Sequence, residues 1–400
     1  MKYVILVGDG MGDYPIPSLG DKTPLEASKT PNMDWIADHG ELGLAATIPS
    51  GCEAGSDTAN LTLLGYDPRS ILSGRGPLEA ASLGIKLEAF DVAFRCNLVT
   101  LASKHGALEM NDYSAGHISS ADSRVLIQEL DRALGNNTFQ FFPGVGYRHI
   151  LVWRNGKTDV ETTPPHDITG KPVKEYLDRL SPAPILLDLI RQAHQILADH
   201  PVNKERINKG EKSATDIWPW GQGHPLKIQP FHERFGLRGG MISAVDLLKG
   251  IAISAGLEVI TVPGATGYLD TNYAGKADYC LRALDKLDFI YLHVEAPDEA
   301  SHNGSLQDKV QAIEAFDEHV VGRVLKGLRC RHPSEFRVMV VTDHYTPITL
   351  MTHTREPVPF AMFATDRPVP CTNRGFNEKS AANSSSIANG AMLMERLASL

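Results

Sequence analysis

The chain has 400 residues, of which 42% are hydrophobic and 22% are charged. These proportions are ordinary for a folded globular protein and exclude a collagen-like or wholly disordered chain. The formal net charge of −9 disfavours binding to duplex nucleic acid, because such binders normally carry a basic face. It is compatible with a local basic pocket for a small anion.

Short apolar runs that end at Gly, Asp or Pro alternate with helical patterns along most of the chain. The runs are Tyr3–Val7, Phe289–Val294, Val338–Val341 and one that starts at Val358, and helical periodicity covers Ile242–Ala255, Ala274–Leu287 and Lys309–Gly327. Strands that alternate with helices predict a parallel, doubly wound α/β sheet with helices on both faces. The Ser/Asn-rich segment 381–392 could start a capped helix or form a mobile loop, and we favour the capped helix.

The segment 85–238 has a different pattern. Its expected strands are shorter and alternate in polarity, at 93–101, 106–113, 147–153 and 157–162, and its helices are expected at Ser120–Leu134 and Ile185–Asp199. Such a mixture is typical of an α+β unit. We therefore expect residues 1–84 and 239–400 to form the α/β core, and residues 85–238 to form an inserted domain.

No apolar run approaches the ~18 residues of a transmembrane helix, and Tyr3–Val7 is too short for a secretory signal. The five cysteines are widely spaced and form neither a CxxC pair nor a disulfide framework. We therefore expect reduced thiols, a cytoplasmic location and no membrane or nucleic-acid partner. The sequence leaves the oligomeric state open. The 15 histidines are a diffuse indication of metal binding.

Acidic residues and histidines concentrate after three of the expected strands. They are, in chain order, Asp9, Asp298, His302, Asp343, His344 and His353. Ligands bind beyond the carboxyl ends of the strands in an open α/β sheet, so these side chains are expected to meet. Carboxylate oxygens and imidazole nitrogens suit Mn, Zn or a similar divalent ion, and two such ions can clamp a phosphoryl group for in-line displacement. Singly, Asp9 could cap a turn, Asp343 could cap a helix and His353 could lie at the surface.

Ser56 precedes the helical run Ala59–Leu64. It could be a helix N-cap, which serine favours. Alternatively, a bound metal could deprotonate its hydroxyl for attack on phosphorus, since a phosphoryl group accepted there would lie against the N–H groups of the helix N-terminus.

Seven segments, in the same order, resemble the cofactor-independent phosphoglycerate mutases, and more closely their archaeal-type branch, which has bacterial members. They are VGDGMGD, TPLEASKTPNMDWIADHG, GSDTANLTLLGYDP, GRGPLEA, PPHDITG, VEAPDEASH, and TDHYTP followed by His353. The resemblance spans essentially the whole chain. It implies an alkaline phosphatase-like fold and two divalent metals, usually Mn or Mg and sometimes Zn or Co. It implies that one metal is held by Asp9, Ser56, Asp343 and His344, and the other by Asp298, His302 and His353.

The resemblance further implies interconversion of 3-phosphoglycerate and 2-phosphoglycerate, with Ser56 transiently phosphorylated and no free 2,3-bisphosphoglycerate. The inserted domain of this family closes over the substrate. By position, His117 in SAGHISS would bind the substrate and transfer a proton, and Asp167 in PPHDITG would belong to an Asp-Arg pair in which His166 replaces the arginine. The remaining candidates for substrate binding are Arg148, Arg206, Arg75 and Lys249. Taken singly, any of these four basic residues is more often a solvated surface charge.

Other functions remain open. Bacterial members of the branch have been proposed to act on homoserine, and the start MKYVILVGDGMGD and the ending of this chain resemble that group at least as well as the archaeal mutases. The same metal core could therefore serve a homoserine kinase-like phosphotransferase. A metal phosphatase or phosphopentomutase of the superfamily is a further alternative. A non-catalytic scaffold would have lost a ligand or the nucleophile, whereas all these positions hold competent residues. The substrate depends on the insertion, around His117, Arg148 and Asp167.

Overall fold

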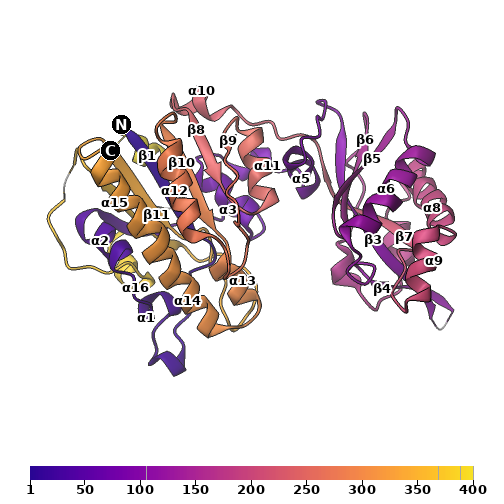
Figure 1. Cartoon of the computed structure of the whole chain (residues 1–400), viewed down its shortest axis with the longest axis horizontal. Helices are drawn as coiled ribbons and strands as arrows, with labels where there is room; N and C mark the ends of the chain where they lie inside the picture. The colour runs from indigo at the N-terminus through magenta and orange to yellow at the C-terminus, as the bar shows by residue number, and fades with distance from the viewer. Residues whose placement is uncertain (105, 368, 388, 400) are drawn as a thin grey trace. The chain divides into compact units, whose positions relative to one another are not determined.

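The computed structural model describes residues 1–104, 106–367, 369–387 and 389–399. The chain forms two compact units, each with its own sheet and helices (Figure 1). Met1–Ile71 and Ile228–Leu400 form the core unit, and Leu72–Lys227 form the inserted unit. The expected boundaries, at 84/85 and 238/239, differ from these limits. Helix α5 (Arg75–Ser82) packs on the inserted sheet, and Phe231 in α10 (Phe231–Phe235) stacks on Phe289 of the core.

The core unit is built on a sheet whose strand order among the described residues is β13-β2-β12-β11-β1-β10-β8-β9. Central β1 is parallel to β10 on one side and to β11 on the other. β8 and β9 continue the parallel part, and β12 is antiparallel to both β11 and β2. The strands are β1 (Lys2–Gly8), β2 (Glu41–Ala45), β8 (Gly239–Ile242), β9 (Glu258–Val259), β10 (Phe289–Val294), β11 (Phe336–Val341), β12 (Val358–Ala364) and β13 (Ser385–Ile387).

Helices cover both faces of this sheet, which is why its central strands are continuously apolar. Helices α2, α12, α14 and α15 are drawn beside β1, β10 and β11 in Figure 1. Val4 and Leu6 of β1 belong to the buried cluster that this sheet shares with these helices. Successive strand residues point to opposite faces of the sheet. On the other face, the Tyr291 hydroxyl in β10 reaches Asn60 in α3. The helical elements are α1 (Pro24–Ala27), α2 (Pro31–His39), α3 (Ser56–Leu63), α4 (Pro68–Ile71), α11 (Asp246–Ser254), α12 (Tyr273–Ala283), α13 (Ala296–His302), α14 (Leu306–Phe316), α15 (Gly322–Arg331), α16 (Glu378–Ala382) and α17 (Met392–Ser399), with a 3-10 turn η1 (Pro17–Leu19) and a π-helical turn η3 (Asp317–Val321).

The inserted unit contains an antiparallel sheet in the order β4-β3-β6-β5, with β7 also paired to β3. The amphipathic helices α6 and α8 bury their apolar stripes in the same core as this sheet, for example through Leu126 and Leu186. The elements are β3 (Val92–Lys104), β4 (Ala107–Asp112), β5 (Phe139–Val145), β6 (Arg148–Trp153), β7 (Asp216–Gly223), α6 (Ser120–Leu134), η2 (Pro165–Ile168), α7 (Lys174–Asp178), α8 (Pro184–Ala198) and α9 (Pro201–Asn208).

The expected fold class, a doubly wound α/β sheet interrupted by an inserted α+β unit, is confirmed. Two details were wrong: residues 157–162 form no strand, and β12 is antiparallel rather than parallel. The segment 381–392 does lead into a helix, since α17 begins at Met392 and Asn389 Oδ1 accepts from the Ala391 N–H just before it. The segment also contains the unforeseen strand Ser385–Ile387, which pairs with β2; residue 388 lies outside the described residues. No helix in the described ranges is both long and apolar enough to cross a bilayer.

Candidate active site

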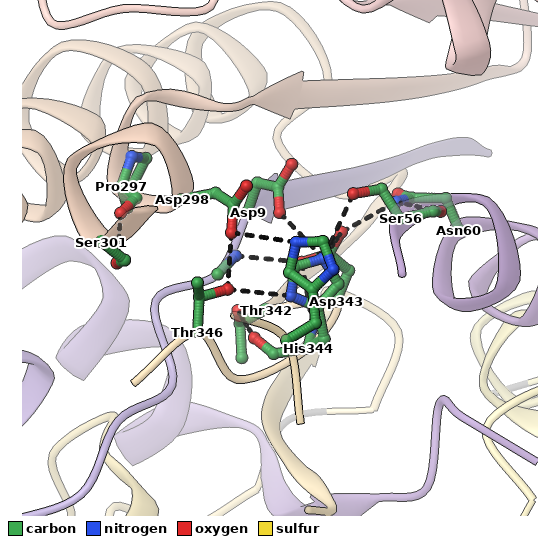
Figure 2. A network of polar contacts seen from close by, with 12 residues as sticks. Asp9, Ser56, Asn60, Pro297, Asp298, Ser301, Thr342, Asp343, His344 and Thr346 are labelled. Carbon is green, nitrogen blue, oxygen red and sulfur yellow. Dashed lines mark hydrogen bonds and ion pairs between the residues drawn. The ribbon is translucent and has the colours of Figure 1, made fainter. Parts of the chain in front are cut away.

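The carboxyl ends of three adjacent parallel strands bring the predicted acidic and histidine side chains together (Figure 2). Asp9 follows β1, β10 leads into α13 with Asp298, and β11 is followed by Asp343 and His344. Because β10 and β11 flank β1 in register, the residues beyond their ends meet at one edge of the sheet.

Asp9, Asp343 and His344 form what we term the first ligand group. Their potential ligand atoms lie within 4.8 Å of one another. His344 Nε2 lies 3.3 Å from Asp9 Oδ1 and 3.5 Å from Asp343 Oδ2, and all three residues are buried. Within the described ranges, Asp9 Oδ1 accepts no hydrogen bond. A buried carboxylate oxygen without a hydrogen bond is costly, and a divalent cation would satisfy it.

Asp298, His302 and His353 form the second ligand group. Asp298 and His302 lie one helical turn apart in α13, with Asp298 Oδ2 3.2 Å from His302 Nε2. His353 Nε2 lies 3.0 Å from His302 Nε2 and 3.6 Å from Asp298 Oδ1. Two imidazole nitrogens at this distance either share one proton or direct their lone pairs at a cation. His344 also has a ligand atom within 4.8 Å of those of Asp298 and His353, so the two groups are contiguous.

Ser56 is the first residue of α3, and its Oγ lies 3.2 Å from His344 Nε2. The N-cap position belongs to Gly55, which has no side chain, and Ser56 is already the first residue of the helix. The N-cap interpretation of Ser56 is therefore wrong. Its hydroxyl points at the first ligand group instead (Figure 2).

A buried amide holds the helix of Ser56 and the first ligand group together. Asn60 Nδ2 donates to Asp343 Oδ2 and to the Ser56 carbonyl, both at 2.8 Å, and Asn60 Oδ1 accepts from the Tyr291 hydroxyl. The other oxygen of Asp343 accepts from the backbone N–H groups of Gly10 at 3.1 Å and His344 at 2.9 Å. Both oxygens of this carboxylate are therefore fixed in direction.

The site has an excess of buried negative charge. Burial, together with the carboxylates of Asp343 and Asp298, raises the pKa of Asp9 well above its ordinary value. Burial would also raise the pKa of Asp298, but hydrogen bonds from His302 and His353 hold it well below its usual range. The hydrogen bond with Asp298 raises the pKa of His302 to about 9. Bound cations would relieve the repulsion among these carboxylates.

The core unit also provides basic groups near the site. Lys249 in α11 donates to Asp246 at 2.9 Å. Buried Lys276 in α12 donates to the His293 carbonyl at 3.0 Å, and burial lowers its pKa to about 8, with Lys249 adding to that effect and Glu295 opposing it. Lys249 therefore lies within electrostatic range of Lys276, which is anchored to the β10 carbonyl of His293.

In the inserted unit, the two predicted histidines lie on an aromatic cluster. His117 is exposed and has a φ of +51°, and its ring packs edge-on against Tyr113 and Tyr147. His166 in η2 packs edge-on against Tyr113 and Trp220, with centroid distances of 6.1 Å and 5.5 Å. The rings of both histidines therefore contact Tyr113.

Arginines surround this cluster. Arg148 at the start of β6 lies 5.4 Å from the Tyr147 ring centroid. Arg95 stacks on Trp220 at 4.2 Å and pairs with Glu79 at 3.1 Å, and the charges of Arg75 and Arg148 help burial to lower its pKa. A concentration of arginines over aromatic rings suits a small carboxylate or phosphate.

Asp167 and Arg206, two further predicted residues of the insert, lie in different environments. Asp167 is exposed, with Oδ1 3.7 Å from His166 Nε2. Arg206, in contrast, is 5% exposed, and its guanidinium bonds Asp122 at 3.2 Å, Glu211 at 2.9 Å and the carbonyls of Ala115 and Lys212. The expectation that Arg206 binds substrate is corrected accordingly: it is a structural residue that joins α9 to the chain before and within α6.

Sequence reasoning missed Asn60, Thr346 and Arg95. Asn60 and Thr346 lie inside the quoted segments GSDTAN and TDHYTP, but amides and hydroxyls next to stronger ligands attract no separate notice. Arg95 could have been found from the sequence, because it lies in the middle of an otherwise apolar strand. A charged residue at such a position is rarely buried unless it is paired, which indicates a specific role.

The doubly wound sheet, its inserted unit and the Asp/His groups beyond its strands define an α/β protein with a candidate metal site at the carboxyl edge of its sheet. A family model described as "2,3-bisphosphoglycerate-independent phosphoglycerate mutase" matches residues 37–203. Among curated proteins, the mutase of that name from Methanosarcina barkeri is 52% identical over 386 residues, 96% of each chain. A "probable" mutase of the same name from Geobacter sulfurreducens is 49% identical over 398 residues, 99% of each. The solved "cofactor-independent phosphoglycerate mutase" of Thermoplasma acidophilum is 27% identical, with a TM-score of 0.67 over 99% of both chains. The chain belongs to the 2,3-bisphosphoglycerate-independent phosphoglycerate mutase family.

Proposed function

We propose that this chain is a metal-dependent mutase that interconverts 3-phosphoglycerate and 2-phosphoglycerate through a phosphoserine at Ser56. The observation that supports this most directly is the position of the Ser56 hydroxyl, 3.2 Å from His344 Nε2 at the start of α3. The substrate is taken from the names of the relatives. We also propose a cytoplasmic location, in keeping with the free state of the five cysteines.

The donor set fits two divalent cations. We assign Asp9, Ser56, Asp343 and His344 to one ion, and Asp298, His302 and His353 to the other. Mixed carboxylate and imidazole donors suit Mn, with Mg, Zn or Co as alternatives. Bound cations supply positive charge to the phosphoryl oxygens and lower the pKa of the serine hydroxyl.

Ser56 Oγ is the nucleophile. It attacks phosphorus in line, the bond between phosphorus and the substrate oxygen breaks, and that oxygen takes up a proton to give glycerate. The 2-hydroxyl of glycerate then loses its proton, attacks the phosphoserine and releases Ser56. Only a phosphoryl group changes place, so no free bisphosphoglycerate is required. The first N–H groups of α3 favour the anionic phosphoserine.

The inserted unit supplies groups for the organic part of the substrate. His117 is our candidate for the proton transfers at the substrate oxygens, because its ring is exposed in the loop before α6. The substrate carboxylate calls for bidentate partners such as arginine. The residues we assign to substrate binding are Arg148, Arg75, His166 and Asp167 of the inserted unit, and Lys249 of the core unit.

A coupled assay of the purified protein with Mn²⁺ tests this function. We expect conversion of 3-phosphoglycerate without added bisphosphoglycerate, and loss of turnover after chelation. Homoserine with a phosphoryl donor is assayed in parallel, and release of inorganic phosphate is measured. Phosphorylation of homoserine without mutase turnover would replace our proposal by the kinase-like function, and phosphate release alone would indicate a phosphatase.

A further inference from the structure

The hydroxyl of Thr346 lies between the two ligand groups. Thr346 Oγ1 is 2.5 Å from Asp298 Oδ1 in the second group and 3.2 Å from His344 Nδ1 in the first (Figure 2). All three side chains are buried, and Thr346 itself has no exposed surface. One hydroxyl therefore contacts a ligand residue of each group.

The directions of these hydrogen bonds follow from their chemistry. An ionised carboxylate only accepts, so the Thr346 hydroxyl donates to Asp298 Oδ1. An oxygen lone pair of Thr346 then accepts from His344 Nδ1–H. This bond leaves His344 Nε2 without a proton, and Nε2 is the atom that faces Asp9, Asp343 and Ser56. Thr346 thus selects the tautomer in which His344 can bind a cation.

The backbone holds this hydroxyl in place. The Thr346 N–H donates to the Gly12 carbonyl at 3.1 Å, and buried Lys309 Nζ donates to the Thr346 carbonyl at 3.0 Å. A Cβ atom added at Gly10 would lie 2.6 Å from Asp298 Oδ1 and 2.7 Å from Thr346 Oγ1. The hydroxyl–carboxylate pair therefore packs directly against a residue that must have no side chain.

We infer that Thr346 is a positioning residue that couples the two ligand groups, by fixing the His344 tautomer and one oxygen of Asp298 at the same time. This inference rests on the proposed function, because it presumes that both groups bind cations. Partners that orient metal ligands typically contribute 10–100-fold to metal affinity, so we expect about that loss when the hydroxyl is removed.

The test is a calorimetric titration of the metal-free protein with Mn²⁺. Thr346→Val keeps the shape and removes the hydroxyl, whereas Thr346→Ser and Thr346→Ala differ from each other only by the hydroxyl. We expect wild-type-like affinity for the serine variant, and roughly 10–100-fold weaker binding for the valine and alanine variants. Thr100→Val is the matched control, because Thr100 is a buried threonine whose hydroxyl donates to the Ser213 carbonyl in the inserted unit.

The alanine variant decides the question if the valine variant does not fold, which circular dichroism of the metal-free proteins shows. A second readout is ¹⁵N NMR of the imidazoles, with the His344 signals assigned by their loss in His344→Gln. We expect the Nδ1–H tautomer in the wild type and the serine variant, and a mixture of tautomers in the alanine variant.

Equal Mn²⁺ affinities of the serine and alanine variants would overturn the inference, even if mutase activity is present. A wild-type protein that binds no Mn²⁺ would overturn the proposed function and this inference together. The two failures are therefore distinguishable without an activity measurement.

Discussion

Asn60 Nδ2 donates to Asp343 Oδ2 at 2.8 Å and thereby joins the helix that begins at Ser56 to the loop that follows β11. The same amide group donates to the Ser56 carbonyl, and its oxygen accepts from Tyr291 in β10. Through these three hydrogen bonds, Asn60 fixes the position of Ser56, the candidate nucleophile, relative to Asp343, a candidate ligand.

Replacing Asn60 tests this link. In Asn60→Ala, the Asp343 carboxylate loses one fixed partner and α3 loses its connection to β10, so we expect kcat/KM to fall about 10–100-fold. Thr62→Val in the same helix is the control, since the Thr62 hydroxyl donates only to the Thr58 carbonyl one turn earlier. Steady-state kinetics on both variants measure the difference. Equal kcat/KM values for Asn60→Ala and the control would contradict the positioning role.

Ser56→Ala is expected to abolish mutase turnover, because no oxygen is left to accept the phosphoryl group. Mn²⁺ binding should weaken but persist, since Asp9, Asp343 and His344 remain. Mass spectrometry of acid-quenched wild-type protein should find a phosphate on the peptide that contains Ser56, and the alanine variant should lack it. Undiminished turnover in the variant would refute the phosphoserine mechanism.

Two arginines of the inserted unit are expected to respond oppositely to substitution. Arg206→Met removes a buried guanidinium that pairs with the half-exposed carboxylates of Asp122 and Glu211 and donates to two backbone carbonyls, so we expect a loss of unfolding free energy of about 2 kcal/mol with little change in KM. Arg148 is exposed over the Tyr147 ring, and Arg148→Met should raise the KM for 3-phosphoglycerate roughly tenfold with little loss of stability.

Urea unfolding and steady-state kinetics on both variants separate the two roles. A raised KM in a stable Arg206→Met variant would restore Arg206 to the substrate-binding set. An unchanged KM in Arg148→Met would remove Arg148 from it.

The sequence predicted that the acidic residues and histidines of the candidate site would meet, because Asp9, Asp298 and Asp343 each follow a short apolar run within a few residues. Their division into two groups was implied only by the family resemblance. The sequence also predicted α6 to its observed bounds, Ser120–Leu134, because that helix combines a clear apolar stripe with a serine N-cap. Periodicity says nothing about strand direction, so antiparallel β12 was not foreseen. The short strand β2 depends on pairing with β12, and β13 depends on pairing with β2, which no single segment encodes.

The contacts between motifs could not be predicted from the sequence either, because they also depend on which strands pair. Thr346 and Asp298 are 48 positions apart in sequence, and Asn60 and Asp343 are 283 apart. Only the adjacency of β1, β10 and β11 in the sheet brings such pairs together. The burial of Arg206 could not be predicted either, because a basic residue in an otherwise polar helix is expected to be exposed.

The metal-free protein should lose stability as the pH rises. Burial, with the neighbouring Glu299 and Asp298, raises the pKa of Glu295 to about 8, against an ordinary value of 4.5. The folded state therefore holds a proton that the unfolded chain releases. This contribution to stability is fully present below pH 4.5 and is lost progressively as the pH rises to about 8.

One such proton corresponds to a slope of at most about 1.4 kcal/mol in unfolding free energy per pH unit. In Glu295→Gln the slope should become shallower, and the part due to Asp9, whose pKa is also raised, should remain. Urea unfolding of the chelated proteins between pH 5 and pH 8 measures both slopes, and identical slopes would show that Glu295 is ionised in the folded state.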